Sequence, residues 1–238
     1  IIEAYRRYAF HLIYQKVHNF CSVDLGGFYL DVLKDRMYTT PTAGRARRSA
    51  QTVMHHIAEC MVRWLAPILS FTAEEIWEFL PGERSESVFL ETWHPVPAVC
   101  ATDVEWPALL QLRGDVTREL ERLRNSGIIG APLDAEVDVY CAPEEYARFS
   151  ALGEELRFFF ITSHARVHRV EGAPPADAVP AANTGRSGVW IAVKPTSDPK
   201  CIRCWQRRPD VGSNPKHPEI CGRCVTNVEG PGEDRRFV

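Results

Sequence analysis

The sequence predicts a mainly α-helical protein: a helical bundle, then a small α+β domain, then a cysteine-rich module that holds a metal ion. Three observations predict this. Apolar residues recur at helical spacing through the first third of the chain, an apolar segment alternates with acidic residues in the middle, and four cysteines close the chain as two C-x-x-C pairs. We expect the three parts to cover residues 1–97, 98–198 and 199–238.

The sequence of residues 1–97 predicts a bundle of four helices. An apolar stripe is already running at Ile1 without a Ser, Thr or Asp cap before it, so we expect the chain to be cut from a longer protein. Pro67 ends the third helix, and Thr72-Ala73-Glu74-Glu75 is a capping box that opens the fourth. The Pro-rich segment 93–97 is extended and marks a boundary. The expected helices cover residues 1–20, 28–38, 48–66 and 72–80.

The second part has mixed character. Its apolar periodicity predicts a helix over 106–125, and the alternation of Val137 and Val139 with acidic residues predicts a half-buried strand over 135–141. A helix follows from Pro143 to residue 156. Two further apolar runs, 158–162 and 188–193, flank an Ala-, Pro- and Gly-rich segment that has the composition of a disordered loop.

The four terminal cysteines predict one structural zinc ion. Cys201-Ile202-Arg203-Cys204 and Cys221-Gly222-Arg223-Cys224 are separated by 16 residues, which is a spacing typical of zinc sites. Two such turns complete a closed tetrahedron with no position for a catalytic water. The alternatives are disulfides, which imply an exported protein, and a redox motif, which should occur once beside a βαβ pattern.

Composition favours an intracellular origin. The remaining cysteines stand singly among apolar residues, as free thiols do in a reducing compartment. No leader peptide and no apolar run of about 20 residues appear, so we expect a cytoplasmic protein without a membrane partner. The net charge of −3 requires any nucleic-acid surface to be local. These single cysteines are Cys21, Cys60, Cys100 and Cys141.

Basic residues gather in two places. Lys34, Arg36 and the arginines at 45, 47 and 48 are offset only by Asp35, and phosphate is their natural partner, although a solvated helix end explains them equally well. In the cysteine module, arginines project from both C-x-x-C turns, and Trp205 could stack on a base or cover the metal. The candidate RNA contacts are Arg36, Arg45, Arg47, Arg48, Trp205, Arg207, Arg208 and Arg223.

The sequence contains no recognisable catalytic motif. Neither a Gly-rich phosphate loop nor H-E-x-x-H nor G-x-S-x-G occurs, and His55-His56 has no i, i+4 metal partner. We expect no catalytic residue in this chain.

Four stretches of the first part, Tyr14–Asp31, Lys34–Tyr38, Arg47–Thr52 and Leu65–Trp77, resemble the anticodon-binding helical domain of the bacterial isoleucyl-tRNA synthetase family. The tail resembles that family's C-terminal zinc-binding segment, in Lys200–Trp205, Ile220–Val225 and Gly232–Phe237. Between these blocks the resemblance is weaker, and residues 171–187 look like a variable insertion. The four terminal cysteines match the family's zinc ligands one by one, whereas the RNA contacts do not carry over.

The resemblance implies the tRNA-recognition end of a class I, ATP-dependent ligase that attaches isoleucine to its tRNA. The family's His-Ile-Gly-His and Lys-Met-Ser-Lys-Ser signatures are absent, so ATP and Mg²⁺ belong to a catalytic domain outside this sequence. The implied partners are isoleucine tRNA, through its anticodon stem-loop, and the catalytic domain of the same polypeptide, in a monomer that binds no DNA. Two other classes remain open: a zinc-ribbon module that binds DNA or protein, and a structural domain without RNA contact.

Overall fold

The computed structural model describes residues 1–99 and 102–238, so Cys100 lies outside the described residues. The chain separates into two compact units, Ile1–Asp31 with Arg47–Ala101 and Val32–Ala46 with Thr102–Val238. The second unit therefore includes most of one helix from the N-terminal third of the sequence. The three-part division at residues 97 and 198 stays a prediction.

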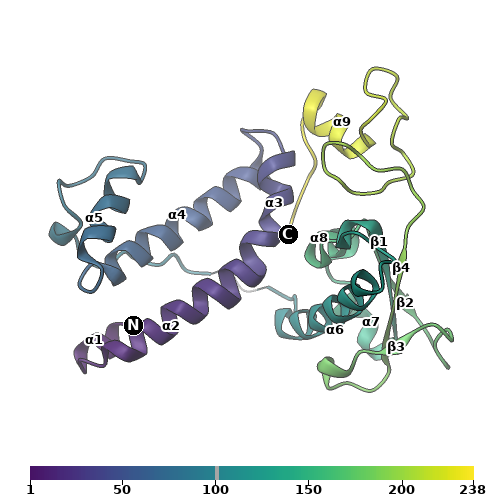
Figure 1. Cartoon of the computed structure of the whole chain (residues 1–238), viewed down its shortest axis with the longest axis horizontal. Coiled ribbons are helices and arrows are strands. Elements are labelled where there is room, and N and C mark those ends of the chain that lie inside the picture. Colours follow the sequence, from purple (N-terminus) through teal and green to yellow (C-terminus); the bar gives the residue numbers. More distant parts are fainter. Residues whose placement is uncertain (100–101) are drawn as a thin grey trace. The chain divides into compact units, whose positions relative to one another are not determined.

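The first unit is helical (Figure 1). Its stripe of apolar residues forms two helices, α1 (Ile2–Arg6) and α2 (Phe10–Asn19), where one was predicted, because Tyr8 adopts a φ of 54° that an α-helix cannot contain. The backbone continues from α2 through a π-helical segment (Phe20–Tyr29) into α3 (Leu30–Thr39), which matches the helix predicted over 28–38 to within two residues at its start. The chain turns back through 40–44 before the next helix.

Helix α4 (Arg45–Leu65) confirms the third predicted helix and begins three residues earlier. Helix α5 (Ser70–Phe79) shows that the predicted capping box is wrong, because Thr72 lies inside the helix and its N-cap, Leu69, makes no side-chain cap. Glu74 instead accepts a hydrogen bond from the backbone N–H of Val88 at 3.4 Å. The carboxylate therefore holds the turn that follows the helix rather than its start.

The core of this unit forms around Trp77. Its ring packs between the guanidinium groups of Arg63 and Arg84, at 4.7 and 4.3 Å from the ring centroid, and its indole N–H donates to the Ser85 carbonyl at 3.0 Å. Both arginines pair with the carboxylate of Glu59, which is 4% exposed. These contacts tie α4, α5 and the segment after α5 together. The apolar residues around Trp77 are Val62, Ala66, Ala73 and Val88.

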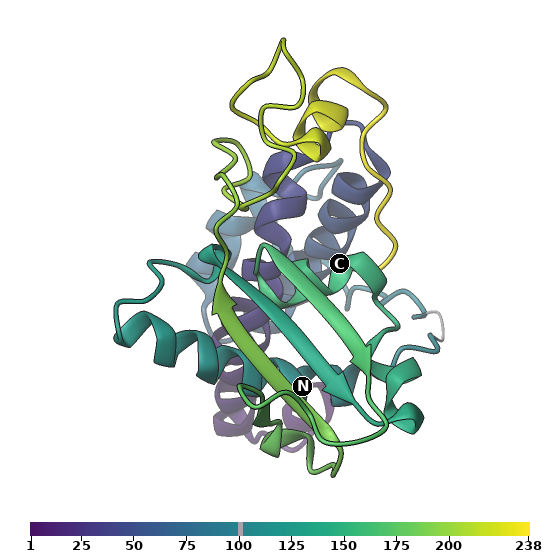
Figure 2. The same cartoon turned by 90° about the vertical axis from the view of Figure 1, so that its right-hand side faces the viewer.

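The second unit contains a four-stranded sheet in the order β2-β1-β4-β3. Strand β1 (Ala135–Cys141) has the predicted bounds and pairs in parallel with β2 (His164–Arg169) and antiparallel with β4 (Val189–Pro195). Strand β3 (Val179–Pro180) adds a short edge. Helices α6 (Trp106–Asn125), α7 (Pro143–Phe149) and α8 (Leu156–Phe160) lie behind the sheet as Figure 2 shows it. Val137 and Val139 are fully buried on that covered face.

Several elements of this unit differ from the sequence prediction. Asp138 points to the uncovered face, yet it is only 4% exposed because Arg166 and His168 of β2 bond to its carboxylate at 2.7 Å. The helix that begins at Pro143 stops at Phe149 rather than running to residue 156, and the chain turns at Gly153, whose φ is +51°. The loop 171–188 contains β3 and is held to α6 by the Asn183 N–H, which donates to Asp115 at 2.9 Å.

The cysteine module follows β4 and contains one short helix, α9 (Gly222–Glu229). After α9, the chain runs back along the unit to Val238 as an extended segment. Among the described residues, every helix is either too short or too polar to cross a membrane.

Candidate metal centre and its arginine contacts

The two C-x-x-C turns bring four thiols together. In the first knuckle, residues 201–204, the Trp205 N–H donates to the Cys201 carbonyl at 2.9 Å and closes the turn. The second knuckle, residues 221–224, runs into α9, with Cys221 as the helix N-cap. Cys201, Cys221 and Cys224 are completely buried, and Cys204 is 8% exposed. The four thiols therefore meet in the interior of the module.

The spacing of the sulfur atoms fits a tetrahedral zinc ion. All four lie within 4.8 Å of one another. The Sγ atoms of Cys201 and Cys224 are 3.8 Å apart, and so are those of Cys204 and Cys221. Zn–S bonds of about 2.3 Å at tetrahedral angles place the sulfurs about 3.8 Å apart, whereas a disulfide requires about 2.05 Å. The geometry therefore favours a shared metal ion over disulfides.

Two hydrogen-bond donors that stabilise a thiolate lie beside the sulfur atoms. The Cys221 N–H points at the Cys201 Sγ at 3.4 Å, and a guanidinium nitrogen of Arg203 lies 3.9 Å from the Cys224 Sγ. The contacts among the thiols lower the pKa of Cys221 and raise the pKa of Cys224. Thiolates are the species that bind zinc.

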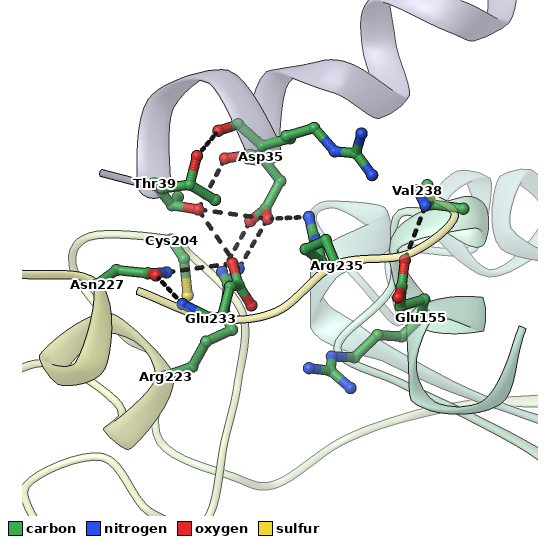
Figure 3. Close-up of polar contacts among 12 residues, drawn as sticks. Asp35, Thr39, Glu155, Cys204, Arg223, Asn227, Glu233, Arg235 and Val238 are labelled. Carbon is green, nitrogen blue, oxygen red and sulfur yellow. Dashed lines mark hydrogen bonds and ion pairs between the residues drawn. The ribbon is translucent and has the colours of Figure 1, made fainter. Parts of the chain in front are cut away.

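One arginine from each knuckle contacts helix α3. Arg203 donates to the Thr39 carbonyl at 2.7 Å. Arg223 forms a two-pronged ion pair with Asp35, with both N···O distances 2.8 Å, and also binds Glu233 at 2.9 Å (Figure 3). Burial opposes the ionisation of Asp35, but the charge of Arg223 outweighs it, so the pKa of Asp35 is lowered. The metal module is therefore fixed to α3 by charged groups.

The extended C-terminal segment completes this cluster. Arg235 donates to Asp35 at 2.9 Å, and its guanidinium carbon lies 3.3 Å from the centroid of the Phe158 ring. The Glu155 carboxylate then accepts the backbone N–H groups of residues 236, 237 and 238 at 2.7 to 2.9 Å, the last of which Figure 3 shows. Because the Arg235 side chain is 1% exposed, the segment is an integral part of the unit.

The eight arginine and tryptophan residues that the sequence nominated for RNA contact divide into two groups. Arg36 is buried, and the Arg223 side chain is 11% exposed and paired with Asp35. Arg207 pairs with Asp134 at 2.8 Å, and Arg208 donates to the Ser163 carbonyl and to His164 Nδ1. The other four lie at the start of α4 and beside the first knuckle. Arg45 and Arg48 are exposed in the first turn of α4, Arg47 is half-buried beside them, and Trp205 is 63% exposed. The structure thus brings Arg223 to the metal centre and leaves Trp205 on its surface.

Sequence reasoning missed the acidic residues of the cluster. Asp35 was counted only as an offset within a basic stretch, and Glu233 received no role. Two features of the sequence could have indicated the contact. Asp35 is a single acid among five basic residues, and each knuckle carries an arginine at the same position. Thr39 gave no signal, because its backbone carbonyl makes the contact with Arg203.

The chain belongs to the family of anticodon-binding domains of tRNA ligases, whose model matches residues 1–139. Residues 198–227 match a second family, described as the zinc finger found in FPG and IleRS, and this match covers all four cysteines.

The relatives include isoleucine–tRNA ligases from several bacteria. The chain is 56% identical to that of Halorhodospira halophila and 55% identical to that of Alkalilimnicola ehrlichii, over 99% of its length in both cases. The ligase of Legionella pneumophila is 50% identical over the whole chain. These alignments cover 25 to 26% of each relative, so the chain spans about a quarter of the length of the ligases that it resembles.

Proposed function

We propose that this chain recognises the anticodon stem-loop of isoleucine tRNA as part of an isoleucine–tRNA ligase. The similarity to such ligases along the whole chain carries the proposal, because 50 to 56% identity extends from the helical unit through the cysteine module. A hydrophobic pocket distinguishes isoleucine from valine by about 100-fold, so the choice of tRNA needs its own recognition surface. The ligation chemistry, with its ATP and Mg²⁺, belongs to the remaining three-quarters of such a ligase.

The start of α4 offers a surface for phosphate. Arg45, Arg47 and Arg48 occupy its first turn, which contains no acidic residue. Cations at this end oppose the helix dipole and repel one another, at a cost of about 0.3–1 kcal/mol each. A phosphate group would relieve this repulsion and accept hydrogen bonds from the guanidinium groups. These arginines therefore position RNA through its backbone, without reading its sequence.

Trp205 offers a surface for an unpaired base. It follows the first knuckle directly, its backbone is held at a φ of 63°, and its side chain is 63% exposed. A tryptophan that shielded the metal from water would be buried. An exposed ring on a rigid turn suits the stacking of a base from an anticodon loop, which is single-stranded.

We assign one structural zinc ion to the four thiols. The cluster supplies four sulfur donors and is buried, so a bound zinc has no open position for substrate or water. Its role is to stabilise the knuckles and hold Trp205 in place. In this account the protein acts as a monomer in the cytoplasm, with no contribution from DNA or a membrane. The boundaries at residues 97 and 198 belong to the same proposal.

The alternative function is a zinc-stabilised structural domain that touches no RNA, and the net charge of −3 favours it. Filter binding of tRNA to the chain at two salt concentrations separates the two. We expect binding that weakens as salt rises, and a loss of about tenfold on Trp205→Ala that Trp205→Phe largely restores. The control is Ile202→Ala, which removes an exposed apolar side chain of the same knuckle. The absence of salt-dependent binding would favour the structural alternative.

A further inference from the structure

The two knuckles carry an arginine at the same position, immediately before the second cysteine: Arg203 and Arg223. Both side chains turn to the same helix. Arg203 binds the Thr39 carbonyl and Arg223 binds the Asp35 carboxylate, and these residues lie four positions apart on α3. Residues at i and i+4 share one face of a helix. The metal module therefore contacts one face of α3 twice, once from each half of its cysteine cluster.

Arg203 joins the metal centre to the end of α3. The same nitrogen, Nη1, lies 2.7 Å from the Thr39 carbonyl and 3.9 Å from the Cys224 Sγ. The carbonyls in the last turn of a helix have no partner within the helix, and that end attracts cations. The guanidinium group of Arg203 satisfies one such carbonyl. The Thr39 hydroxyl, which donates to the Asp35 carbonyl at 2.7 Å, links the two contact points.

The metal centre adds negative charge beside this cluster of arginines. Three guanidinium groups, those of Arg203, Arg223 and Arg235, meet two carboxylates, those of Asp35 and Glu233. Zinc with four thiolates adds a net charge of about −2, which lies against Arg203. The bound metal therefore favours the arginine positions that hold α3, both through its charge and by fixing the shape of the knuckles.

We propose that Arg203 and Arg223 are positioning residues that couple metal binding at the four cysteines to the C-terminal half of helix α3. The inference rests on the zinc ion of the proposed function and deepens it, because α3 leads directly to the arginines at the start of α4. Metal binding thereby orders a segment more than 160 residues earlier in the chain. Because coupling between two sites is reciprocal, a change on α3 must also weaken the hold on the metal.

The test uses this reciprocity. Zinc-loaded chain is mixed with the chromogenic chelator 4-(2-pyridylazo)resorcinol, and the rate of zinc release is measured. Asp35→Asn keeps the shape of the side chain and removes its charge, and we expect release to become about tenfold faster. The matched control is Asp138→Asn, which removes a buried, arginine-paired carboxylate from the sheet of the same unit. It should change the rate by less than about twofold.

Hydrogen exchange of residues 32–39 provides the second readout. We expect zinc removal to speed exchange there in the unmodified chain. Arg203→Gln with Arg223→Gln should show fast exchange with zinc still bound at one ion per chain, and Arg203→Lys with Arg223→Lys should restore part of the protection. The control pair, Arg207→Gln with Arg208→Gln, removes contacts of the same module to Asp134 and Ser163 and should leave 32–39 protected.

The outcomes separate this inference from the zinc assignment. A chain that binds no zinc overturns both. The coupling alone is overturned by three results found together. The chain binds one zinc, the Asp35→Asn and Asp138→Asn variants release zinc at the same rate, and hydrogen exchange at residues 32–39 does not change on chelation.

Discussion

Arg223 and Asp35, 188 positions apart in the chain, form a two-pronged ion pair with both N···O distances 2.8 Å. The Arg223 side chain is 11% exposed and that of Asp35 is 19% exposed, so water weakens the pair little. This contact joins α3 to the metal module within the unit that contains Val32–Ala46. Zinc binding and helix position are therefore expected to respond together.

The metal content gives the first prediction. Native mass spectrometry should find one zinc per chain, which is lost on denaturation or chelation. Structural zinc contributes roughly 10–16 kcal/mol of apparent binding free energy in small peptides, more than a core of about 40 residues supplies. Hydrogen exchange after chelation should show residues 200–238 unfolded and α4 still protected. A metal-free chain with an ordered tail contradicts the assignment.

The second prediction concerns how the stability of the helical unit depends on pH. Arg84 and Arg63 overcome the burial of Glu59 and lower its pKa to about 2. Because the folded pKa lies below the unfolded one, this stabilisation is complete above pH about 4.5 and is lost as pH falls towards about 2. Glu59→Gln should lower the free energy of unfolding by about 3 kcal/mol at neutral pH and flatten its dependence on pH in that window.

Urea denaturation followed by circular dichroism measures both effects. Glu121→Gln is the control, since Glu121 forms an exposed i, i+3 pair with Arg124 and should change stability by less than about 0.5 kcal/mol. If Glu59→Gln behaved like the control, the buried ion pairs of Glu59 would not stabilise this unit.

The third prediction concerns the arginines at the start of α4. Changing Arg45, Arg47 and Arg48 to Ala should weaken binding of isoleucine tRNA and other tRNAs alike, and reduce the salt slope by about 0.7–0.9 for each phosphate that is no longer neutralised. The control triple, Arg118, Arg122 and Arg124 to Ala, removes three exposed arginines of α6 that are each paired with an acid. Equal weakening by both triples would mean that only total charge matters.

The fourth prediction concerns the metal ligands and is tested in a full-length ligase that contains this chain. Cys221→Ser with Cys224→Ser should leave adenylate formation nearly intact and lower tRNA charging, because the knuckles hold RNA-facing residues remote from the chemistry. Cys21→Ser, a thiol outside the cluster, is the control. A parallel loss of both activities would identify the module as a general stabiliser, and unchanged charging would make it dispensable.

Local patterns predicted the elements with strong periodicity. The helix at 106–125 and the strand at 135–141 have the predicted bounds, because a clear apolar face defines each of them. Strand β2 was missed because polar residues occupy most of it, and two of them, Arg166 and His168, bond to Asp138 on the neighbouring strand. The capping box failed because α5 begins at Ser70, two residues before Thr72, with Leu69 as its N-cap.

The metal centre was predictable, and its surroundings were not. The cysteine spacing alone predicts four ligands, and these four do form a cluster. The arginines of the knuckles look free in the sequence, since their partners Asp35 and Thr39 lie in the first sixth of the chain. Charge counting within a module cannot detect such a pair. Among the candidate RNA contacts, the fold leaves Arg45, Arg48 and Trp205 exposed.

The affinity of the chain for isoleucine tRNA, compared with the same tRNA carrying a different anticodon, tests the central claim most directly. Filter binding at one fixed salt concentration is sufficient, because both RNAs share every other feature. A chain that reads the anticodon should bind the altered tRNA at least about tenfold more weakly, a difference of about 1.4 kcal/mol. Equal affinities for the two RNAs would contradict the account.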